Sequence, residues 1–400
     1  MDFGVVYTQE QELFRKEVRA WLEDNVPEEM KVPYDEANYT SEMHEFWKQK
    51  QNELGKKGWL FSTYKEEDGG GGLSPDHRSV IEEEFREYRA MRPITSTYTV
   101  DVLSVWANDD QKDKFLRPLL QGEKFEHMRM TEPHSGADLA DYRGKAVRDG
   151  DDWILNGENV FISAHGDEDF FPGPMHTDEN APRHRNLGYF VVPNPSPGLE
   201  VREMDLLPGR RQKHITMTNV RIPGDHLIGG ETQGWQVHGT HLEAEHGGGG
   251  SSLGRDELID NLTTYVQEKN TDGAESVDSV KQNTTVDAYL ESHVDSMLGK
   301  RAYWRYQAGL GNTYEGNVHN VHNRVGGLRN SVRVRDVMGP YALLNADDER
   351  APHGGMEEVD QRSSAGQRHA GGSTNIAKVI LARRIGISRT KERPAPTPKG

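Results

Sequence analysis

Histidines and a glutamate past the middle of the chain have the residue types of a metal site. His238 and His241 are three positions apart, the spacing of neighbours on one helix face, and Glu243 and His246 follow them. The His-Glu-x-x-His pattern of helical zinc sites is absent. Because the chain holds 17 histidines, chance clustering explains this group better, and we predict no metal ion.

Other patterns that carry catalysis are missing or incomplete. The glycine run at residues 69–72 lacks the Lys-Ser/Thr ending of a phosphate-binding loop, and no Gly-x-Ser-x-Gly nucleophile turn occurs. The acidic runs at residues 82–84 and 109–110 are adjacent in sequence, so their carboxylates do not face each other on a helix. The chain has no cysteine, which excludes disulfides and thiol catalysis. Redox chemistry would therefore need a bound cofactor.

Composition limits the partners. The 48 basic and 65 acidic side chains give a formal net charge of −17, which argues against binding nucleic acid. No stretch reaches the roughly 18 apolar residues of a membrane span, and the start of the chain lacks a basic and apolar leader. We therefore expect a cytoplasmic protein. Only 34 % of the residues are hydrophobic, so burial between subunits would supplement a thin core.

The elements that position any site fall into three expected domains. Residues 1–126 are helical in pattern, with a capping box from Thr8 to Gln11 and a helix from Tyr39 whose end is expected at Gly55. Residues 127–235 show short apolar runs between turns, which is typical of strands. Residues 236–400 return to helical patterns, including a last helix from about Thr374. Helices at both ends of a β region predict an α+β fold.

Within the β region, two local signals are specific. The turn at residues 148–151 lies between two short apolar runs and predicts a hairpin. The run from Tyr189 to Val192, closed by Pro193, predicts a buried strand.

Six ordered motifs resemble the acyl-CoA dehydrogenase family. The segment from Met128 reads Met-Arg-Met-Thr-Glu-Pro-His-Ser-Gly-Ala-Asp and is similar to the family's flavin-binding signature. The other five lie at residues 65–74, 111–123, 177–193, 371–376 and 381–389. The resemblance implies an N-terminal helical domain, a central β-barrel-like domain and a C-terminal four-helix bundle. It also implies FAD-dependent α,β-dehydrogenation of an acyl-CoA, with electrons passed to an electron-transfer flavoprotein, in a homo- or heterotetramer.

The resemblance also implies the general base. Many members carry the glutamate just before a C-terminal Gly-Thr, but here that place is held by Gly371. Another branch, which includes isovaleryl-CoA dehydrogenase, carries it in a Leu-x-x-Glu-Arg pattern after the β domain. Leu242-Glu243-Ala244-Glu245-His246 matches that pattern, so Glu245 is the expected catalytic base. The expected substrate-binding residues are Ala137, Glu243, His246 and Gly371.

Matching motif positions give the expected flavin contacts. They are Met128, Met130, Thr131, Ser135, Gly136, Ala137, Phe161, Ile162, Ser163, Gly372, Ser373, Thr374 and Asn375. Phe161 and Ser163 replace the family's Trp and Thr, which keeps an aromatic surface and a hydroxyl donor.

Two departures keep other functions open. His246 replaces the family's Arg, and residues 268–273 lack the Arg-x-x-Phe-Gly motif that reaches a neighbouring subunit's FAD. A partner subunit without full cofactor binding is therefore an alternative, as is an O₂-using flavoenzyme of the same fold. The glycine run at residues 247–250 suggests a pocket widened for a bulky, branched or ring-bearing acyl group, or else a helix break or packing site.

Overall fold

The computed structural model describes most of the chain, in two compact units. It describes residues 7–31, 35, 39–88, 97–207, 211–247, 256–271, 277–308, 310, 314–364, 366 and 373–388. The first unit comprises Met1–Asp35, Glu82–Ala90 and His246–Glu392, and the second comprises Glu36–Ile81, Met91–Glu245 and Arg393–Gly400.

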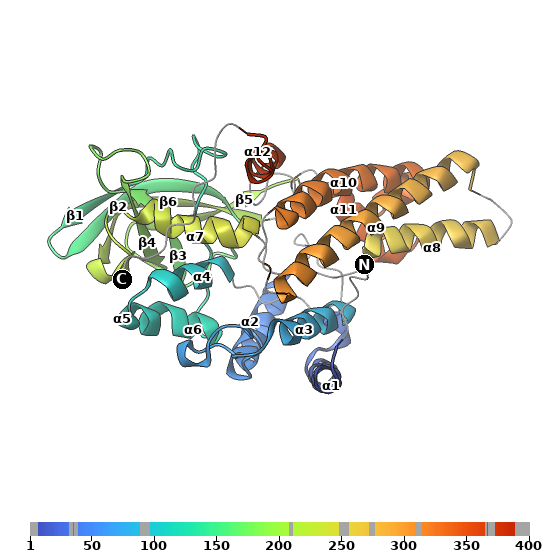
Figure 1. Ribbon diagram of the computed structural model, residues 1–400, viewed down its shortest axis with the longest axis horizontal. Coiled ribbons are helices and arrows are strands. Elements are labelled where there is room, and N and C mark those ends of the chain that lie inside the picture. The colour runs from blue at the N-terminus through green and yellow to red at the C-terminus, as the bar shows by residue number, and fades with distance from the viewer. Residues whose placement is uncertain are drawn as a thin grey trace. The chain divides into compact units, whose positions relative to one another are not determined.

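The second unit is built on one mixed sheet of seven strands (Figure 1). The strands are β1 (Lys145–Asp149), β2 (Asp152–Ile162), β3 (Phe170–His176), β4 (Leu187–Pro193), β5 (Leu199–Asp205), β6 (Arg211–Pro223) and β7 (Leu227–Ile228). Their order is β5-β6-β2-β1-β3-β4-β7. The α+β class is confirmed, but among the described strands β5 and β7 remain the two ends of the sheet. It is open rather than closed into a barrel.

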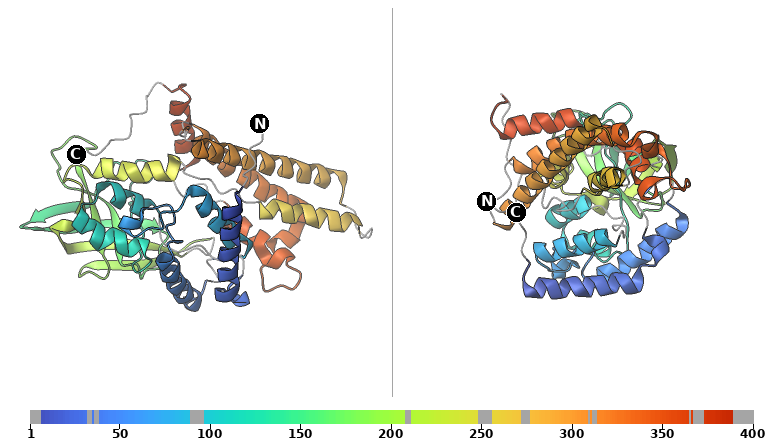
Figure 2. Two further views of the ribbon diagram at one scale, coloured as in Figure 1. Left: turned by 60° about the horizontal axis from the view of Figure 1, so that its bottom comes forward. Right: turned by 90° about the vertical axis from the view of Figure 1, so that its right-hand side faces the viewer.

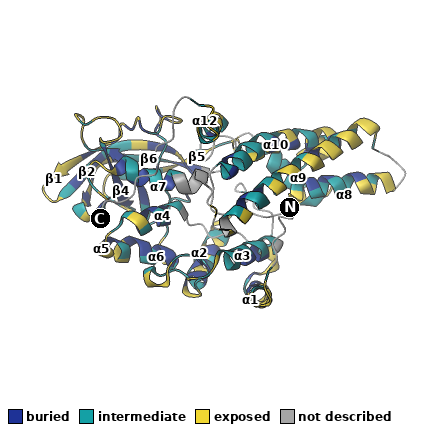
Figure 3. Cartoon of the chain, in the orientation of Figure 1, coloured by how far each residue is buried: buried dark blue, intermediate teal, exposed yellow. Residues whose placement is uncertain are grey.

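The expected hairpin and buried strand are both present. Asp149 pairs with Asp152 across a two-residue turn, where Gly150 has the positive φ of 66° that such a turn requires. Strand β4 is buried on both faces, because alternate residues join different clusters. Phe190 packs with the aromatic residues of β2 and β3, whereas Tyr189 packs with the helices. Figure 3 shows this concentration of buried residues in the sheet.

Helices precede and follow the strands in the second unit. They are α2 (Ser41–Lys56), the first part of α3 (Pro75–Glu87), α4 (Thr97–Trp106), α5 (Asp109–Gln111), a π-helical turn (Lys112–Leu116), α6 (Arg117–Leu120) and α7 (Gly234–Gly247). The helix expected from Tyr39 begins at Ser41 and runs past Gly55. That glycine is required by packing instead of capping, since a Cβ there would lie 2.2 Å from the Gln121 carbonyl oxygen.

The first unit is helical. It contains α1 (Gln9–Asn25), the end of α3, α8 (Glu257–Thr271), α9 (Ser279–Gln307), α10 (Glu315–Met338), α11 (Met356–Ser363) and α12 (Thr374–Arg384). The capping box from Thr8 to Gln11 is confirmed. Helices α8, α9 and α10 pack around Leu262, Ala288 and Val334, and α9 runs beside α10 in Figure 2. No described helix has the length and apolar character needed to cross a membrane.

Candidate active site

The segment 127–131 lies between strands β2 and β3, held by backbone hydrogen bonds on both sides. These bonds run from His127 N–H to the Phe170 oxygen (3.2 Å), from Arg129 N–H to the Pro172 oxygen (2.8 Å) and from Val160 N–H to the Thr131 oxygen (2.8 Å). The last bond joins the two stretches that hold the expected flavin contacts of the β region. Residues 128–131 and 161–163 are therefore brought together by the fold.

Burial differs between neighbouring residues at positions 128–130. Met128 and Met130 are half-buried, whereas Arg129 between them is buried. Alternation with period two is what an extended backbone produces. Met128, Met130 and Thr131 are each half-buried and give the segment an edge that a ligand can reach. The Arg129 guanidinium points into the sheet, where it bonds to carbonyl oxygens of β3.

Phe161 has a backbone conformation that aromatic residues rarely adopt. Its φ is +58°, and 55 % of the residue is exposed, while Ile162 next to it is buried. The pairing of β2 with β6 shifts register between Asn159 and Ile162, so the strand bulges at this point. A non-glycine residue in this region of φ costs about 1–3 kcal/mol, and such strain gathers at ligand-binding sites. The bulge presents the Phe161 ring outward.

Ser163 is held by a partner that the sequence did not reveal. The side-chain amide of Gln212 donates to the Ser163 hydroxyl oxygen at 2.9 Å, and that hydroxyl can in turn donate to the Gln212 amide oxygen, 3.3 Å away. When Gln212 donates, the hydroxyl proton is free to point elsewhere. Gln212 lies on β6 and is buried. Only the pairing of β2 with β6 brings it to Ser163, so no local pattern could have found it.

The remaining positions of the flavin signature form a tight turn. Glu132 and Ser135 exchange backbone hydrogen bonds, and the Ser135 hydroxyl donates to the Asp138 carbonyl oxygen at 2.5 Å. That hydroxyl therefore stabilises the turn itself. Gly136 and Ala137 are exposed, and a Cβ on Gly136 would have nothing within 4 Å. The backbone of the turn is therefore accessible to solvent at these two residues.

The expected base lies on α7. The helix is tied to α4 by a hydrogen bond from the Trp106 indole to the Thr240 hydroxyl, at 2.8 Å. His238 and His241 are buried with stacked rings 5.4 Å apart, and Tyr98 meets His241 edge-on at 5.0 Å. They pack in an aromatic cluster.

Several expected site residues lie outside the part that can be described. The backbone of α7 includes Glu243, Glu245 and His246, but their side chains lie outside the described residues, as do Gly371 and Gly372. Ser373 accepts the Ile376 amide and caps α12, in which Thr374 and Asn375 are the first residues. These three residues belong to the first unit, whereas Met128, Thr131 and Phe161 belong to the second.

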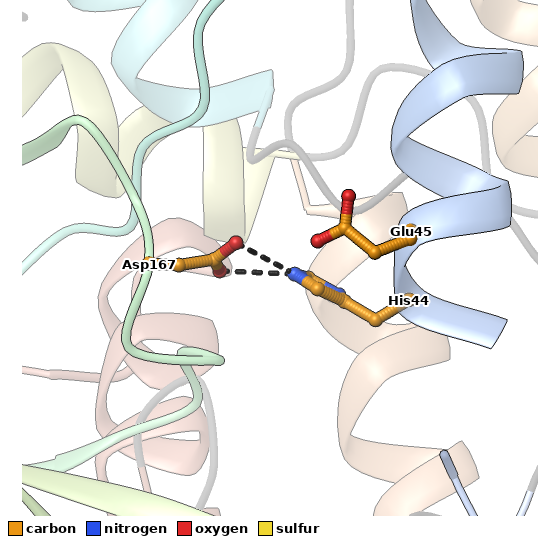
Figure 4. Close-up of side chains that lie close together, drawn as sticks. All are labelled: His44, Glu45 and Asp167. Carbon is orange, nitrogen blue, oxygen red and sulfur yellow. Dashed lines mark hydrogen bonds and ion pairs between the residues drawn. The ribbon is translucent and has the colours of Figure 1, made fainter. Parts of the chain in front are cut away.

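A polar cluster anchors the loop that follows Ser163. His44 Nε2 lies 2.9 Å from a carboxylate oxygen of Asp167, and Glu45 is the next residue on α2 (Figure 4). These three side chains are close enough to share a metal ion. However, Lys48 Nζ lies 2.7 Å from Asp167 and 3.6 Å from Glu45, so an ammonium already supplies the positive charge. We infer that the cluster is an ion-pair clasp between α2 and the loop.

Two family comparisons cover the first half of the chain. Residues 8–123 match the acyl-CoA dehydrogenase N-terminal domain, and residues 127–220 match the acyl-CoA dehydrogenase middle domain. The chain belongs to the acyl-CoA dehydrogenase family.

Individual relatives and solved structures agree. The acyl-CoA dehydrogenase FadE29 of Mycobacterium tuberculosis is 34 % identical over 194 residues, 48 % of this chain and 50 % of that protein. The chain spans about half the length of the curated relatives it matches. The ChsE4-ChsE5 complex from Mycobacterium tuberculosis contains a chain with a TM-score of 0.83 and 21 % identity, covering 97 % of this chain and 100 % of its own. The steroid ACAD Tcur3481-Tcur3483 has a TM-score of 0.80 and 20 % identity, covering 98 % and 100 %. Both likenesses concern the fold.

The clasp predicts a pH-dependent stability. The hydrogen bond from His44, together with Lys48, holds the pKa of Asp167 well below its usual range. A lowered pKa stabilises the fold above the unfolded value of about 3.9, and that stability is lost as the pH falls. After allowance for an Asp167 side chain that is 43 % exposed, Asp167→Asn should cost about 1 kcal/mol at neutral pH and lower the melting temperature by about 2–4 °C.

Thermal unfolding of Asp167→Asn at neutral pH and below about pH 4 checks this expectation. Glu45→Gln, a neighbour with a longer contact to Lys48, is the matched control and should melt within 1–2 °C of the unsubstituted chain, roughly the effect of an exposed ion pair. Equal melting temperatures for Asp167→Asn and the unsubstituted chain at neutral pH would contradict the clasp.

Proposed function

We propose that this chain catalyses FAD-dependent α,β-dehydrogenation of an acyl-CoA thioester to the 2-enoyl-CoA, with an electron-transfer flavoprotein as acceptor. The observation that carries the proposal is the hydrogen bond between Val160 and Thr131, which places the flavin signature beside the bulge at Phe161. Membership of the acyl-CoA dehydrogenase family supports the reaction class.

The residues of this edge fit a flavin. Met128, Met130 and Thr131 line an accessible edge, the outward Phe161 ring can lie against a planar group, and the backbone of Gly136 is open. The Ser163 hydroxyl can direct its proton to a ring nitrogen while Gln212 donates to its oxygen. When bound, the flavin accepts the β hydrogen of the acyl group as hydride.

Glu245 is the proposed general base. A hydrogen on the carbon beside a thioester is weakly acidic, and its removal needs a positioned carboxylate. Glu245 would take that proton. Donors to the thioester oxygen would stabilise the enolate charge that develops there. Support comes from the position of Glu245 on α7 and from Gly371, which has no side chain to serve as an alternative base. Ala137, Glu243, His246 and Gly371 are the proposed substrate contacts.

The proposed acyl group is bulky, branched or ring-bearing. Gly247, the first glycine of the run, lies on the described part of α7, two residues after Glu245, and residues 248–250 lie outside the described part. One similar solved structure is a steroid ACAD, which favours a large substrate.

A substrate series tests this choice. With straight short-chain, branched and ring-bearing acyl-CoA esters, we expect kcat/KM to be at least tenfold higher for the bulky esters, about 1.4 kcal/mol in transition-state binding. Anaerobic reduction of the bound flavin gives the rates. A preference for short straight chains would exclude the widened pocket while leaving the reaction class intact.

A partner subunit with incomplete cofactor binding is the second candidate. It is favoured by the absence of Arg-x-x-Phe-Gly at residues 268–273 and by the similarity to a chain of the ChsE4-ChsE5 complex. An O₂-using flavoenzyme is a third candidate. The cytoplasmic location and the division into domains 1–126, 127–235 and 236–400 remain part of the proposal.

The role of Glu245 gives a direct prediction. Glu245→Gln removes the base but keeps the size of the side chain, so FAD should stay bound while reduction by acyl-CoA slows by at least about 10³-fold, within the range that acid–base catalysis contributes. Stopped-flow absorbance of the flavin band measures this rate, and the retained absorbance of the resting sample confirms loading. Glu257→Gln, at the start of α8, is the control, and acyl-CoA should reduce its flavin at the unsubstituted rate. Reduction of Glu245→Gln at the unsubstituted rate would remove Glu245 from the mechanism.

Self-association is proposed from helix α9, which carries an exposed apolar stripe. Its members are Val286 (55 % exposed), Leu290 (56 %), Val294 (47 %) and Met297 (57 %). Spacings of four, four and three place them along one face of the helix. A second chain covering this stripe would bury the apolar surface that the thin core leaves outside, which supports a homo- or heterotetramer.

The double variant Leu290→Glu/Met297→Glu should therefore dissociate the assembly into smaller species, because two buried carboxylates without partners oppose the interface. Light scattering coupled to gel filtration measures the mass. Leu207→Glu, at an 85 % exposed residue elsewhere, is the control and should leave the mass unchanged. An unaltered mass for the double variant would show that α9 does not form the interface.

A further inference from the structure

Arg129 is a buried cation whose partners are all neutral. The residue is 1 % exposed. Its guanidinium donates to the carbonyl oxygens of Phe171 (3.1 Å), Gly173 (3.1 Å) and Pro174 (3.4 Å) and to the side-chain oxygen of Asn159 (3.4 Å). These bonds supply donors to carbonyl oxygens of β3, but neutral acceptors do not cancel the positive charge of the guanidinium.

No carboxylate in the described part of the chain forms an ion pair with Arg129. The carboxylate that acts on it through space is Glu132, which instead accepts the backbone amides of Arg143 (2.7 Å) and Gly144 (2.9 Å). His134 lies 3.2 Å from the same carboxylate. Burial lowers the pKa of Arg129 to about 10, so the guanidinium remains protonated at neutral pH. Burying a charge without an ion-pair partner carries a desolvation cost that neutral hydrogen-bond acceptors offset only in part.

The position of Arg129 indicates where that charge acts. It lies between the half-buried Met128 and Met130, and its guanidinium is directed to the carbonyl oxygens of β3. The segment lies close against β3, because a Cβ on Gly173 would lie 2.2 Å from the Arg129 backbone oxygen, so only glycine fits there. A charge in a weakly screening interior acts across one layer of side chains.

We propose that Arg129 raises the reduction potential of the flavin bound along the Met128–Thr131 edge. This inference rests on the proposed function. In that reaction the acyl group loses a proton from its α carbon to Glu245 and a hydride from its β carbon to the flavin, and a C=C bond forms. The flavin gains two electrons and one proton, so its ring system acquires one negative charge. A fixed cation behind the edge stabilises that charge in the reduced state only. Glu132 opposes the effect in part.

The competing explanation is that Arg129 has only a structural role, as a hydrogen-bond donor to the carbonyl oxygens of β3. The two roles separate in matched variants. Arg129→Met removes both the charge and the donors, whereas Arg129→Lys keeps the charge but loses the guanidinium fork. A structural role predicts lower melting temperatures for both variants and one common potential. An electrostatic role predicts that only Arg129→Met changes the potential.

The experiment is an equilibrium reduction of the FAD-loaded protein against a reference dye. For Arg129→Met we expect the ratio of reduced to oxidised flavin at a fixed dye potential to fall at least tenfold, which is about 30 mV for two electrons. Arg129→Lys should stay within a third of that shift. Identical potentials for Arg129→Met and the unsubstituted protein overturn the inference.

If Arg129→Met does not bind FAD, the reduction potential of the FAD-loaded Glu132→Gln variant tests the inference instead. Removing the opposing negative charge should raise the potential, and an unchanged potential overturns the inference. Failure of this inference can be told apart from failure of the proposed function. An unsubstituted chain that binds no FAD contradicts both, whereas a chain that acyl-CoA reduces, with variants of unshifted potential, contradicts the electrostatic role alone.

Discussion

The hydrogen bond from the Val160 amide to the Thr131 carbonyl is the contact on which the site in the second unit depends. It closes a short ladder in which the segment 127–131 bonds to β3 on one side and to β2 on the other. With this ladder in place, the Thr131 backbone lies beside Val160, next to the bulge at Phe161, and the Arg129 guanidinium bonds to carbonyl oxygens of β3. The turn at Ser135 is held separately, by its own backbone hydrogen bonds and by the Glu132 carboxylate, which accepts the amides of Arg143 and Gly144.

Local signals in the sequence predicted the local structure well. The capping box at Thr8 and the hairpin at Gly150 each depend on residues fewer than five positions apart, and both are confirmed. The resemblance of the motifs also singled out Met128, Met130, Thr131 and residues 161–163, and their contact with a flavin stays a prediction.

Features set by long-range packing could not be predicted. Gly55 looked like a helix end, but it is small because the Gln121 backbone lies against it. The sheet stays open because β5 and β7 have no pairing partner beyond β6 and β4 among the described strands. Gln212 meets Ser163 only through the register of β2 and β6. Arg129 could have been noticed as a charge between two methionines, but its neutral partners depend on β3.

Composition and structure lead to the same conclusion about association. A chain in which 34 % of residues are hydrophobic still leaves a continuous apolar stripe exposed on α9. At the same time, the interior of the second unit accommodates a guanidinium and stacked histidines. Apolar surface outside and charge inside are both costly for an isolated chain. A partner on α9 and an anionic reduced flavin beside Arg129 would offset those costs.

In the proposed reaction this chain removes two hydrogens from an acyl-CoA, and the flavin takes up their electrons. Mass spectrometry of the CoA ester after one anaerobic turnover of the FAD-loaded protein tests it most directly. We expect an ester lighter by two hydrogens, in an amount equal to the flavin reduced. An unchanged ester beside oxidised flavin, or a product that has gained oxygen when air is admitted, would contradict it.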